Sequence, residues 1–303
     1  MPDFDGICSG DILVFESSST DLLPGFLPYA VQSDGFFNHA LGTSAGSLSP
    51  RTKWSDLARY EFALPPLDEQ ARIVEVLQQA EELAERLHDA KLLATRARES
   101  LIATRLDAAH DVPLGALLRS CEYGLSLASD PTGDIPILRM NNLNGEDLVF
   151  GDLRWVRAAP SLEPYFVRPG DILVNRTNSA ELVGKVALVE SLPQPMVYAS
   201  YLLRLRVDSD RGLPEYVTGF LQSAEGRRRL TAFVTKGVSQ ANINASNLKR
   251  VLVPIPSLEV QRQCVVAWRA CRELQTSLAS HHALTRRIGQ LLREEMMGGR
   301  VVQ

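Results

Sequence analysis

About forty residues without glycine or proline follow Pro65 and Pro66, and this stretch most constrains what the chain can fold into. It begins with Asp68 and Glu69, and acidic residues in a first turn stabilise the positive end of a helix dipole. We therefore predict one long helix that ends near Leu106.

Apolar residues recur along this stretch at alternating intervals of four and three, the pattern of a coiled-coil seam. A seam needs a partner, and the positions 191 residues later repeat the alternation, interrupted by His281 and Thr285. We predict that the two helices pair through an interface formed by Val76, Ala80, Leu83, Leu87, Ala94, Leu101, Cys271, Leu274, Leu278, Ile288 and Leu292.

The residues that lead into the two helices match at the same spacing. Leu57, Pro65, Leu67 and Gln70 correspond to Leu248, Pro256, Leu258 and Gln261. Such a repeat indicates two copies of one unit, each a globular module followed by a long helix. We predict a truncated first module at 1–67, the first long helix at 68–110, a complete second module at 111–258, and the second helix with a tail at 259–303.

The second module has the pattern of a mixed, mostly β domain with short helices. Five short runs, at 136–140, 154–158, 171–177, 185–190 and 201–207, are separated by glycine, proline and asparagine and predict strands. Residues 214–234 then predict two helical segments broken near Gly226, and a polar loop follows at 235–250. The predicted fold class is α+β, and the loop is the first place to look for function.

The first module is shorter at two places. SGDILVF at 9–15 predicts a turn and a short buried strand, and it returns as PGDILVN at 169–175, 160 residues later. The spacing becomes 190 to 191 after Gln32, so about thirty residues are missing from the first copy, and nothing before Gly10 matches 113–167. A module of 67 residues is marginal alone, so we expect it to pack on the helices.

Composition excludes several classes of protein. A chain of 303 residues, 45% hydrophobic and 22% charged, predicts about two globular domains. Its four cysteines form no C-x-x-C pair, which argues against a disulfide framework and against a zinc site. With no apolar stretch of eighteen residues and no visible signal peptide, the predicted location is the cytoplasm, away from any membrane.

Several motifs together resemble the DNA-specificity (S) subunit of type I restriction–modification systems. They are the G-D-I-L-V strand, the GVSQANIN loop, the N-L-K-R-V-L-V-P-I-P-S-L-E-V-Q approach to a long helix, and the duplication of the whole unit. The resemblance covers about 10–297 and implies two target-recognition domains joined by an antiparallel coiled coil. It implies double-stranded DNA, methyltransferase subunits and restriction or motor subunits as partners in phage defence.

The same resemblance implies a non-catalytic chain without cofactors, whose partner subunits use S-adenosylmethionine, ATP and magnesium. Residues 1–67 carry three Lys and Arg against eight Asp and Glu, a balance that repels phosphate, so we do not expect them to contact bases. Such a chain would be a half-specificity protein that dimerises through its truncated half, a product of gene rearrangement, or a chain with a misassigned start.

DNA recognition requires cations for phosphates and amides or guanidiniums for base edges. Without a role in DNA binding, the run of arginines at 227–229 would be a solvated helix end, and the Asn and Gln side chains of the 235–250 loop would cap their own backbone. The 141–144 asparagines are better explained as a turn. The candidate DNA contacts are Asn175, Arg176, Asn178, Arg227, Arg228, Arg229, Lys236, Ser239, Gln240, Asn242, Asn244, Lys249 and Arg250.

Two alternatives stay open. A specificity-like structural or regulatory subunit would bind the methyltransferase without recognising DNA. An enzyme would use Ser44 or another site, but the G-x-S-x-G at 42–46 lies in a shortened loop and lacks a counterpart near Gly237. We predict that 42–46 is a turn.

Overall fold

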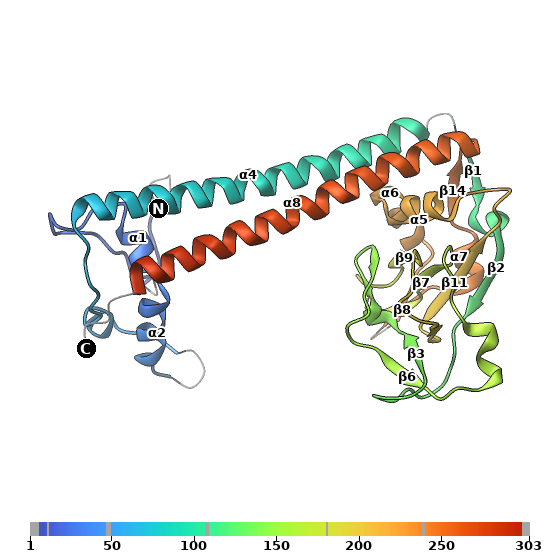
Figure 1. Cartoon of the computed structure of the whole chain (residues 1–303), viewed down its shortest axis with the longest axis horizontal. Helices are drawn as coiled ribbons and strands as arrows, with labels where there is room; N and C mark the ends of the chain where they lie inside the picture. Colours follow the sequence, from blue (N-terminus) through green and yellow to red (C-terminus); the bar gives the residue numbers. More distant parts are fainter. Residues whose placement is uncertain are drawn as a thin grey trace. The chain divides into compact units, whose positions relative to one another are not determined.

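A computed structural model describes residues 6–10, 12–46, 50–106, 109–179, 181–237 and 240–298. The chain forms two compact units: unit 1 contains Met1–Leu93 and Leu274–Gln303, and unit 2 contains Ala94–Glu273. The two long helices, α4 (Leu67–Leu106) and α8 (Leu258–Gly298), each begin in one unit and end in the other (Figure 1). Both lie where the sequence predicts them, whereas the predicted module limits stay predictions.

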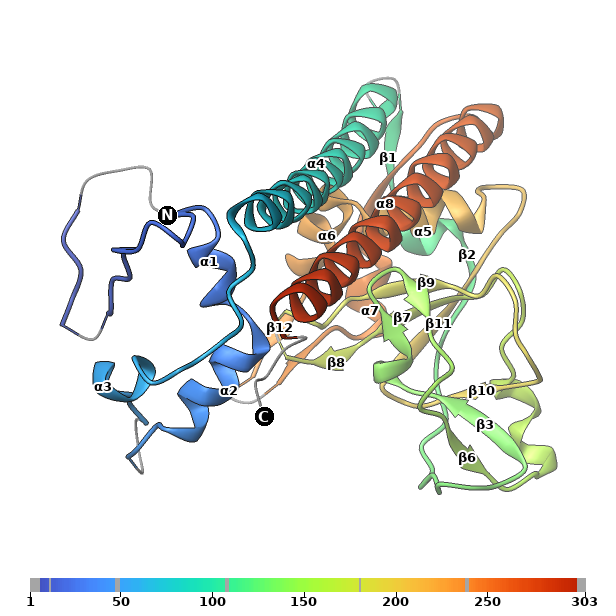
Figure 2. The same cartoon turned by 60° about the vertical axis from the view of Figure 1, so that its left-hand side comes forward.

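Unit 1 is helical. The short helices α1 (Leu27–Ala30), α2 (Asp34–Gly42) and α3 (Trp54–Leu57) precede α4 along the chain (Figure 2). Its buried core joins Phe26, Tyr29 and Ala30 on or beside α1 to Ile73, Val74 and Leu77 of α4. The first module therefore packs on the long helix, as expected for a segment of this length, which buries too little surface to be stable alone.

In unit 1, α4 and α8 lie side by side and antiparallel (Figures 1 and 2). Glu81, early in α4, pairs with Arg293, late in α8, at 3.2 Å. Further along α4, the rings of His88 and His282 lie 5.9 Å apart. Leu292 of α8 reaches the core cluster formed by α1 and α4.

The buried stripe of the helices differs from the predicted seam at four positions. Val76, Leu83, Leu274 and Ile288 are among the exposed large apolar side chains, and the stripe passes through their neighbours Leu77, Ala84, Gln275 and Gly289. The predicted Ala80, Leu87, Ala94, Cys271, Leu278 and Leu292 are buried or half-buried, and the side chain of Leu101 lies outside the described residues. The shift at Val76 arises because α4 packs against α1 as well as α8, and Ile73, Val74 and Leu77 face that additional partner.

Unit 2 contains the strands and is mixed α+β, as predicted. Its main sheet is antiparallel, in the order β2 (Leu118–Tyr123), β11 (Leu202–Val207), β7 (Ile172–Asn175) and β9 (Val186–Leu188). A second sheet has the order β10 (Val197–Tyr198), β3 (Ile135–Leu138) and β6 (Arg154–Val156). Smaller sheets pair β1 (His110–Pro113) with β14 (Leu252–Ile255), β4 (Leu143–Asn144) with β5 (Asp147–Leu148), and β12 (Thr235–Lys236) with β13 (Ala241–Asn242) and β8 (Thr177–Asn178).

Among the described residues, unit 2 also contains short α-helices and 3-10 helices. The α-helices are α5 (Pro214–Gln222), α6 (Ala224–Thr231) and α7 (Ala245–Lys249), and the 3-10 helices are η1 (Leu114–Leu117), η2 (Met140–Asn142) and η3 (Pro160–Tyr165). The two predicted helical segments are present, but the break between them lies at Ser223, three residues before Gly226. Ser223 accepts the Gly226 backbone N–H and so caps α6, which a glycine-based prediction misses.

The internal repeat is visible in equivalent hydrogen bonds. Gln70 is fully buried at the start of α4, where it accepts the Leu23 N–H at 2.8 Å and donates to the Pro65 carbonyl at 2.8 Å. Gln261 makes the equivalent bonds at the start of α8, accepting the Leu213 N–H at 2.9 Å and donating to the Pro256 carbonyl at 2.9 Å. Ser33 caps α2 as Ser223 caps α6.

The two copies of the D-I-L-V sequence adopt different structures. Ile172, Leu173 and Val174 form β7, between β11 and β9, and are 0% exposed. Ile12, Leu13 and Val14 lie in irregular backbone and are 57%, 42% and 69% exposed. The prediction of a buried strand at 9–15 is therefore wrong for the described residues, because unit 1 provides them with no neighbouring strand.

Candidate nucleic-acid interface

The polar loop after α6 forms a small sheet with the segment that follows β7. The β12–β13 hairpin adds to β8, so that Thr235, Asn242 and Thr177 stand opposite one another across three strands. The Asn242 side-chain amide donates to the Thr177 hydroxyl at 2.8 Å. The sheet thus brings together the two predicted groups of DNA contacts, those after β7 and those in the loop.

Arg176 lies at the junction of these segments. Its backbone N–H donates to the Tyr201 carbonyl at 3.0 Å, and its carbonyl accepts the Ile243 N–H at 2.9 Å. Its guanidinium lies 5.0 Å from the centre of the Tyr123 ring, and Nη1 donates to the Ser200 carbonyl at 3.1 Å. The side chain is half-buried, so it is both held in place and accessible to a ligand.

Tyr123 connects β2 to the polar loop. Besides supporting Arg176, its hydroxyl accepts the Ala245 N–H at the start of α7 at 3.1 Å. Tyr123 and Tyr201 are exposed, whereas most large side chains of the unit are buried. Sequence reasoning missed both tyrosines, because Tyr123 ends β2 and Tyr201 begins the predicted strand run at 201–207, and an aromatic residue in a strand is expected in a core.

Asn175 is a correction to the predicted contacts. It is 0% exposed at the end of β7, and its side-chain amide donates to the Leu182 carbonyl at 3.4 Å. Its backbone binds Lys185 and Gly184, which holds the turn that precedes β9. Asn175 supports this turn and has no exposed surface for DNA.

The guanidinium groups of Arg227, Arg228 and Arg229 already bind other groups of the protein. Arg227 donates to the carbonyls of Val183 and Glu181, and burial lowers the pKa of its guanidinium. Arg229 bridges Glu225 and Asp111, each at 2.7 Å. Arg228 also pairs with Glu225, at 2.7 Å, but its side chain is exposed. The run is therefore not a free cationic patch, and Arg228 is its member best placed for phosphate.

The remaining predicted contacts differ in their availability. Asn244 caps α7 by accepting the Asn247 N–H at 2.7 Å, which is the backbone-capping role given above as the alternative to DNA contact. Asn178 accepts the Ser179 N–H at 2.8 Å. Gln240, Lys249 and Arg250 are exposed, and the Arg250 guanidinium lies 5.2 Å from the centre of the Phe233 ring. Ser239 and the side chain of Lys236 lie outside the described residues.

Other predicted motifs have structural roles. Asn142 is buried, where it accepts the Arg139 N–H and donates to the Val149 carbonyl, so the asparagines at 141–144 form part of a turn. Ser44 follows α2, and its hydroxyl donates to the Leu41 carbonyl at 2.8 Å. This geometry fits the predicted turn at 42–46.

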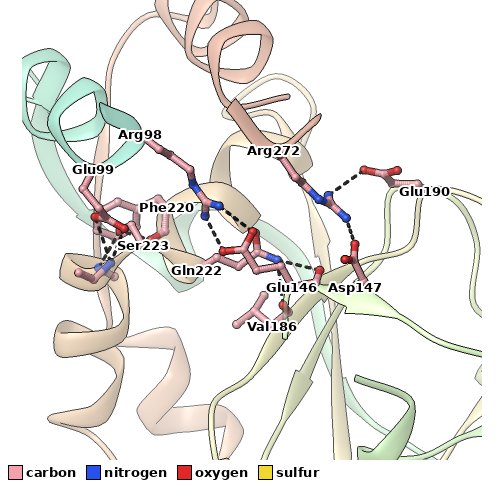
Figure 3. A network of polar contacts seen from close by, with 12 residues as sticks. Arg98, Glu99, Glu146, Asp147, Val186, Glu190, Phe220, Gln222, Ser223 and Arg272 are labelled. Carbon is pink, nitrogen blue, oxygen red and sulfur yellow. Dashed lines mark hydrogen bonds and ion pairs between the residues drawn. The ribbon is translucent and has the colours of Figure 1, made fainter. Parts of the chain in front are cut away.

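A polar network joins both long helices to the second module within unit 2 (Figure 3). Arg98 of α4, 9% exposed, binds Glu146 through two bonds of 2.6 and 2.7 Å. Arg272 of α8 pairs with Asp147 and, at 3.5 Å, with Glu190. Glu146 lies in the turn of the β4–β5 hairpin beside Gly145, which adopts a positive φ of 65°, and Asp147 begins β5. Side chains distant in sequence therefore fix both helices to one hairpin.

Other site types find no support among the described residues. They contain no group of three or more His, Cys, Asp and Glu that could hold a metal ion. Within the same ranges, no helix combines the length and apolarity needed to cross a membrane.

Comparison with known proteins finds related chains over most of the sequence. The StySPI type I restriction enzyme specificity subunit of Salmonella potsdam is 25% identical over 263 residues, which cover 80% of this chain and 57% of the relative. The EcoKI specificity subunit of Escherichia coli K12 is 25% identical over 285 residues, which cover 86% and 60%. The chain thus spans less than two thirds of these curated relatives. No family profile matches it.

Solved structures show the same fold. A chain from a structure of type I restriction–modification complex assembly has a TM-score of 0.54 at 19% identity, covering 90% of this chain and 70% of its own. The type I S subunit from M. genitalium has a TM-score of 0.55 at 15% identity, covering 91% and 73%. The predicted resemblance to type I specificity subunits and the predicted fold class are confirmed.

Proposed function

We propose that this chain, a relative of type I specificity subunits, binds duplex DNA through its second module and positions methyltransferase subunits on it. The observation that carries the proposal is the similarity to two curated specificity subunits over 80% and 86% of the chain. The fold supports the proposal because the second module contains the sheet β2-β11-β7-β9, and the polar loop pairs with β8, the segment that follows β7.

The long helices suit a role as spacers. At about 1.5 Å per residue, the 40 residues of α4 extend roughly 60 Å. This length exceeds one turn of B-DNA, about 34 Å. The helices and adjoining faces would bind the methyltransferase subunits, and restriction or motor subunits would join the same complex in the cytoplasm for phage defence.

The chain itself would be non-catalytic. S-adenosylmethionine, ATP and magnesium would be used by the partner subunits, which would carry out methylation and cleavage. This division of roles is what the relationship to specificity subunits implies, and the proposal assigns no catalytic residue to this chain.

Selection from a randomised duplex library tests the proposal. The purified chain with its cognate methyltransferase subunit is incubated with the library at one fixed moderate salt concentration, because non-specific affinity depends steeply on salt. Sequencing of the retained duplexes should show one enriched half-site, or a palindromic pair if two chains act together. A stable protein complex without enrichment would contradict DNA recognition.

One alternative is favoured by unit 1. Residues 1–67 are acidic, and Ile12, Leu13 and Val14 lack the sheet that covers their counterparts. A specificity-like subunit that binds the methyltransferase without recognising DNA would share these features. It predicts complex formation with no sequence preference, which is the negative outcome of the selection.

A further inference from the structure

We propose that Arg176 is a specificity-determining residue of the second module, that Tyr123 positions it, and that it recognises the guanine of a G·C pair. The inference deepens the proposed function and rests on it.

The charge environment separates Arg176 from the arginines of β11 in the main sheet. Arg204 is 2% exposed and pairs with Glu122 and Asp171, and Arg206 binds Asp171 at 2.8 Å. Within the described residues, Arg176 forms no ion pair, and its guanidinium is supported by a ring and a carbonyl oxygen. Its charge is therefore not neutralised by a carboxylate and can attract an electron-rich partner.

The geometry leaves the terminal nitrogens as the available donors. Nε is buried without a hydrogen-bond partner, so it cannot reach a ligand outside the protein. Nη1 uses one N–H for Ser200, and Nη2 has no bond to a described residue. A guanidinium with two adjacent donors fits O6 and N7 of guanine, the acceptor pair on its major-groove edge.

Preorganisation favours recognition over simple attachment to a phosphate. The Tyr123 ring and the Ser200 carbonyl fix the plane of the guanidinium, while backbone bonds on both sides of Arg176 fix its Cα. Less side-chain entropy is then lost when a base is bound. A phosphate contact would require charge but not a fixed plane, so a lysine could replace the arginine.

An arginine that only stabilises the β8–β13 junction would have the same protein contacts. The two roles differ in their response to DNA chemistry, because a structural arginine would not respond to an altered guanine. The available donors and the exposed neighbours Tyr123 and Tyr201 favour base recognition.

The test repeats the library selection with Arg176→Lys, with Arg119→Lys as a matched control, because Arg119 is an exposed arginine that pairs with Asp208 at 3.1 Å. Arg176→Lys should lose about tenfold or more of discrimination at one G·C pair, with non-specific affinity nearly unchanged. Arg119→Lys should retain the wild-type preference. If Arg176→Lys keeps the full wild-type preference, the inference is overturned and the proposed function stands.

Replacing that guanine with 7-deazaguanine removes the N7 acceptor. The wild-type complex should lose affinity for the modified duplex, whereas Arg176→Lys should bind both duplexes equally. Equal wild-type affinity for the two duplexes, or loss of discrimination at an A·T pair, would contradict the inference. A wild-type complex that enriches no sequence would instead contradict the proposed function.

Variants of Tyr123 test positioning independently of Arg176. Tyr123→Phe keeps the ring and should retain the preference, while Tyr123→Leu should weaken it at the same base pair as Arg176→Lys. Thermal unfolding of each variant identifies any that fails to fold. Folded Tyr123→Leu with unchanged specificity would show that the ring does not position Arg176.

Discussion

The two modules share the residues that attach them to the long helices and differ in the sheet. Gln70 and Gln261 make equivalent buried hydrogen bonds, and Ser33 and Ser223 cap equivalent short helices. The main sheet occurs only in the second module among the described residues, and only there is the D-I-L-V sequence a buried strand. Neighbouring strands, rather than local sequence, thus decide whether this sequence becomes a strand.

The largest expected difference lies in the two D-I-L-V sequences. Leu173→Ala should reduce the free energy of unfolding by about 2–5 kcal/mol, because it leaves a cavity in a closed core. Leu13→Ala, at the equivalent position of the first module, should change it by less than about 0.5 kcal/mol because Leu13 is already exposed. Urea denaturation followed by circular dichroism measures both. Equal losses would mean that the first copy is also buried in solution.

A smaller effect is expected where the modules are alike. Gln70→Ala and Gln261→Ala should each cost about 1–3 kcal/mol, because each leaves a buried backbone N–H and a carbonyl without their partner. Gln70 also donates to the Asp21 carbonyl, so its replacement should cost at least as much. Gln79→Ala, on the exposed face of α4, is the control. A cost at only one glutamine would contradict structural equivalence of the modules.

The smallest effect concerns a charge cluster of the second module whose equivalent positions in the first module carry other residues. Hydrogen bonds from Arg228 and Arg229 lower the pKa of Glu225 to about 2, whereas α2 has Gly35, Asn38 and His39 at the equivalent positions. A lowered carboxyl pKa stabilises the fold above the unfolded value of about 4.3, and this stabilisation is lost as the pH falls toward 2. Glu225→Gln should cost under about 1 kcal/mol at pH 7.

The loss caused by Glu225→Gln should shrink as the pH falls from about 5 to 2, because protonation removes the same charge from the wild-type chain. Urea denaturation of both chains at several pH values measures this change. A constant difference across that range would mean that Glu225 does not titrate with the lowered pKa.

Periodicity predicted the long helices because helix formation depends on residues close in sequence, and the repeat was predicted because its matching residues recur at a constant spacing. The seam was less predictable, because the stripe through Leu77 instead of Val76 depends on packing against α1, from a distant segment. A strand pattern likewise cannot show that Asn175 is buried, since both faces of β7 are covered by residues far along the chain.

The candidate site was predicted in part. The sequence placed Arg176 and the polar loop in one interface, but it could not show that Asp111 pairs with Arg229. Asp111 lies more than a hundred residues from Arg229, so only the fold reveals this pair. The contribution of Tyr123 was hidden for the same reason, because its contacts are with Arg176 and Ala245.

Hydrogen–deuterium exchange with and without an enriched duplex tests most directly whether the second module alone recognises DNA. The duplex should slow exchange in peptides that cover 176–178 and 240–250, while peptides from 20–60 should exchange at the same rate in both states. Slower exchange in the first module together with no change near Arg176 would contradict the account.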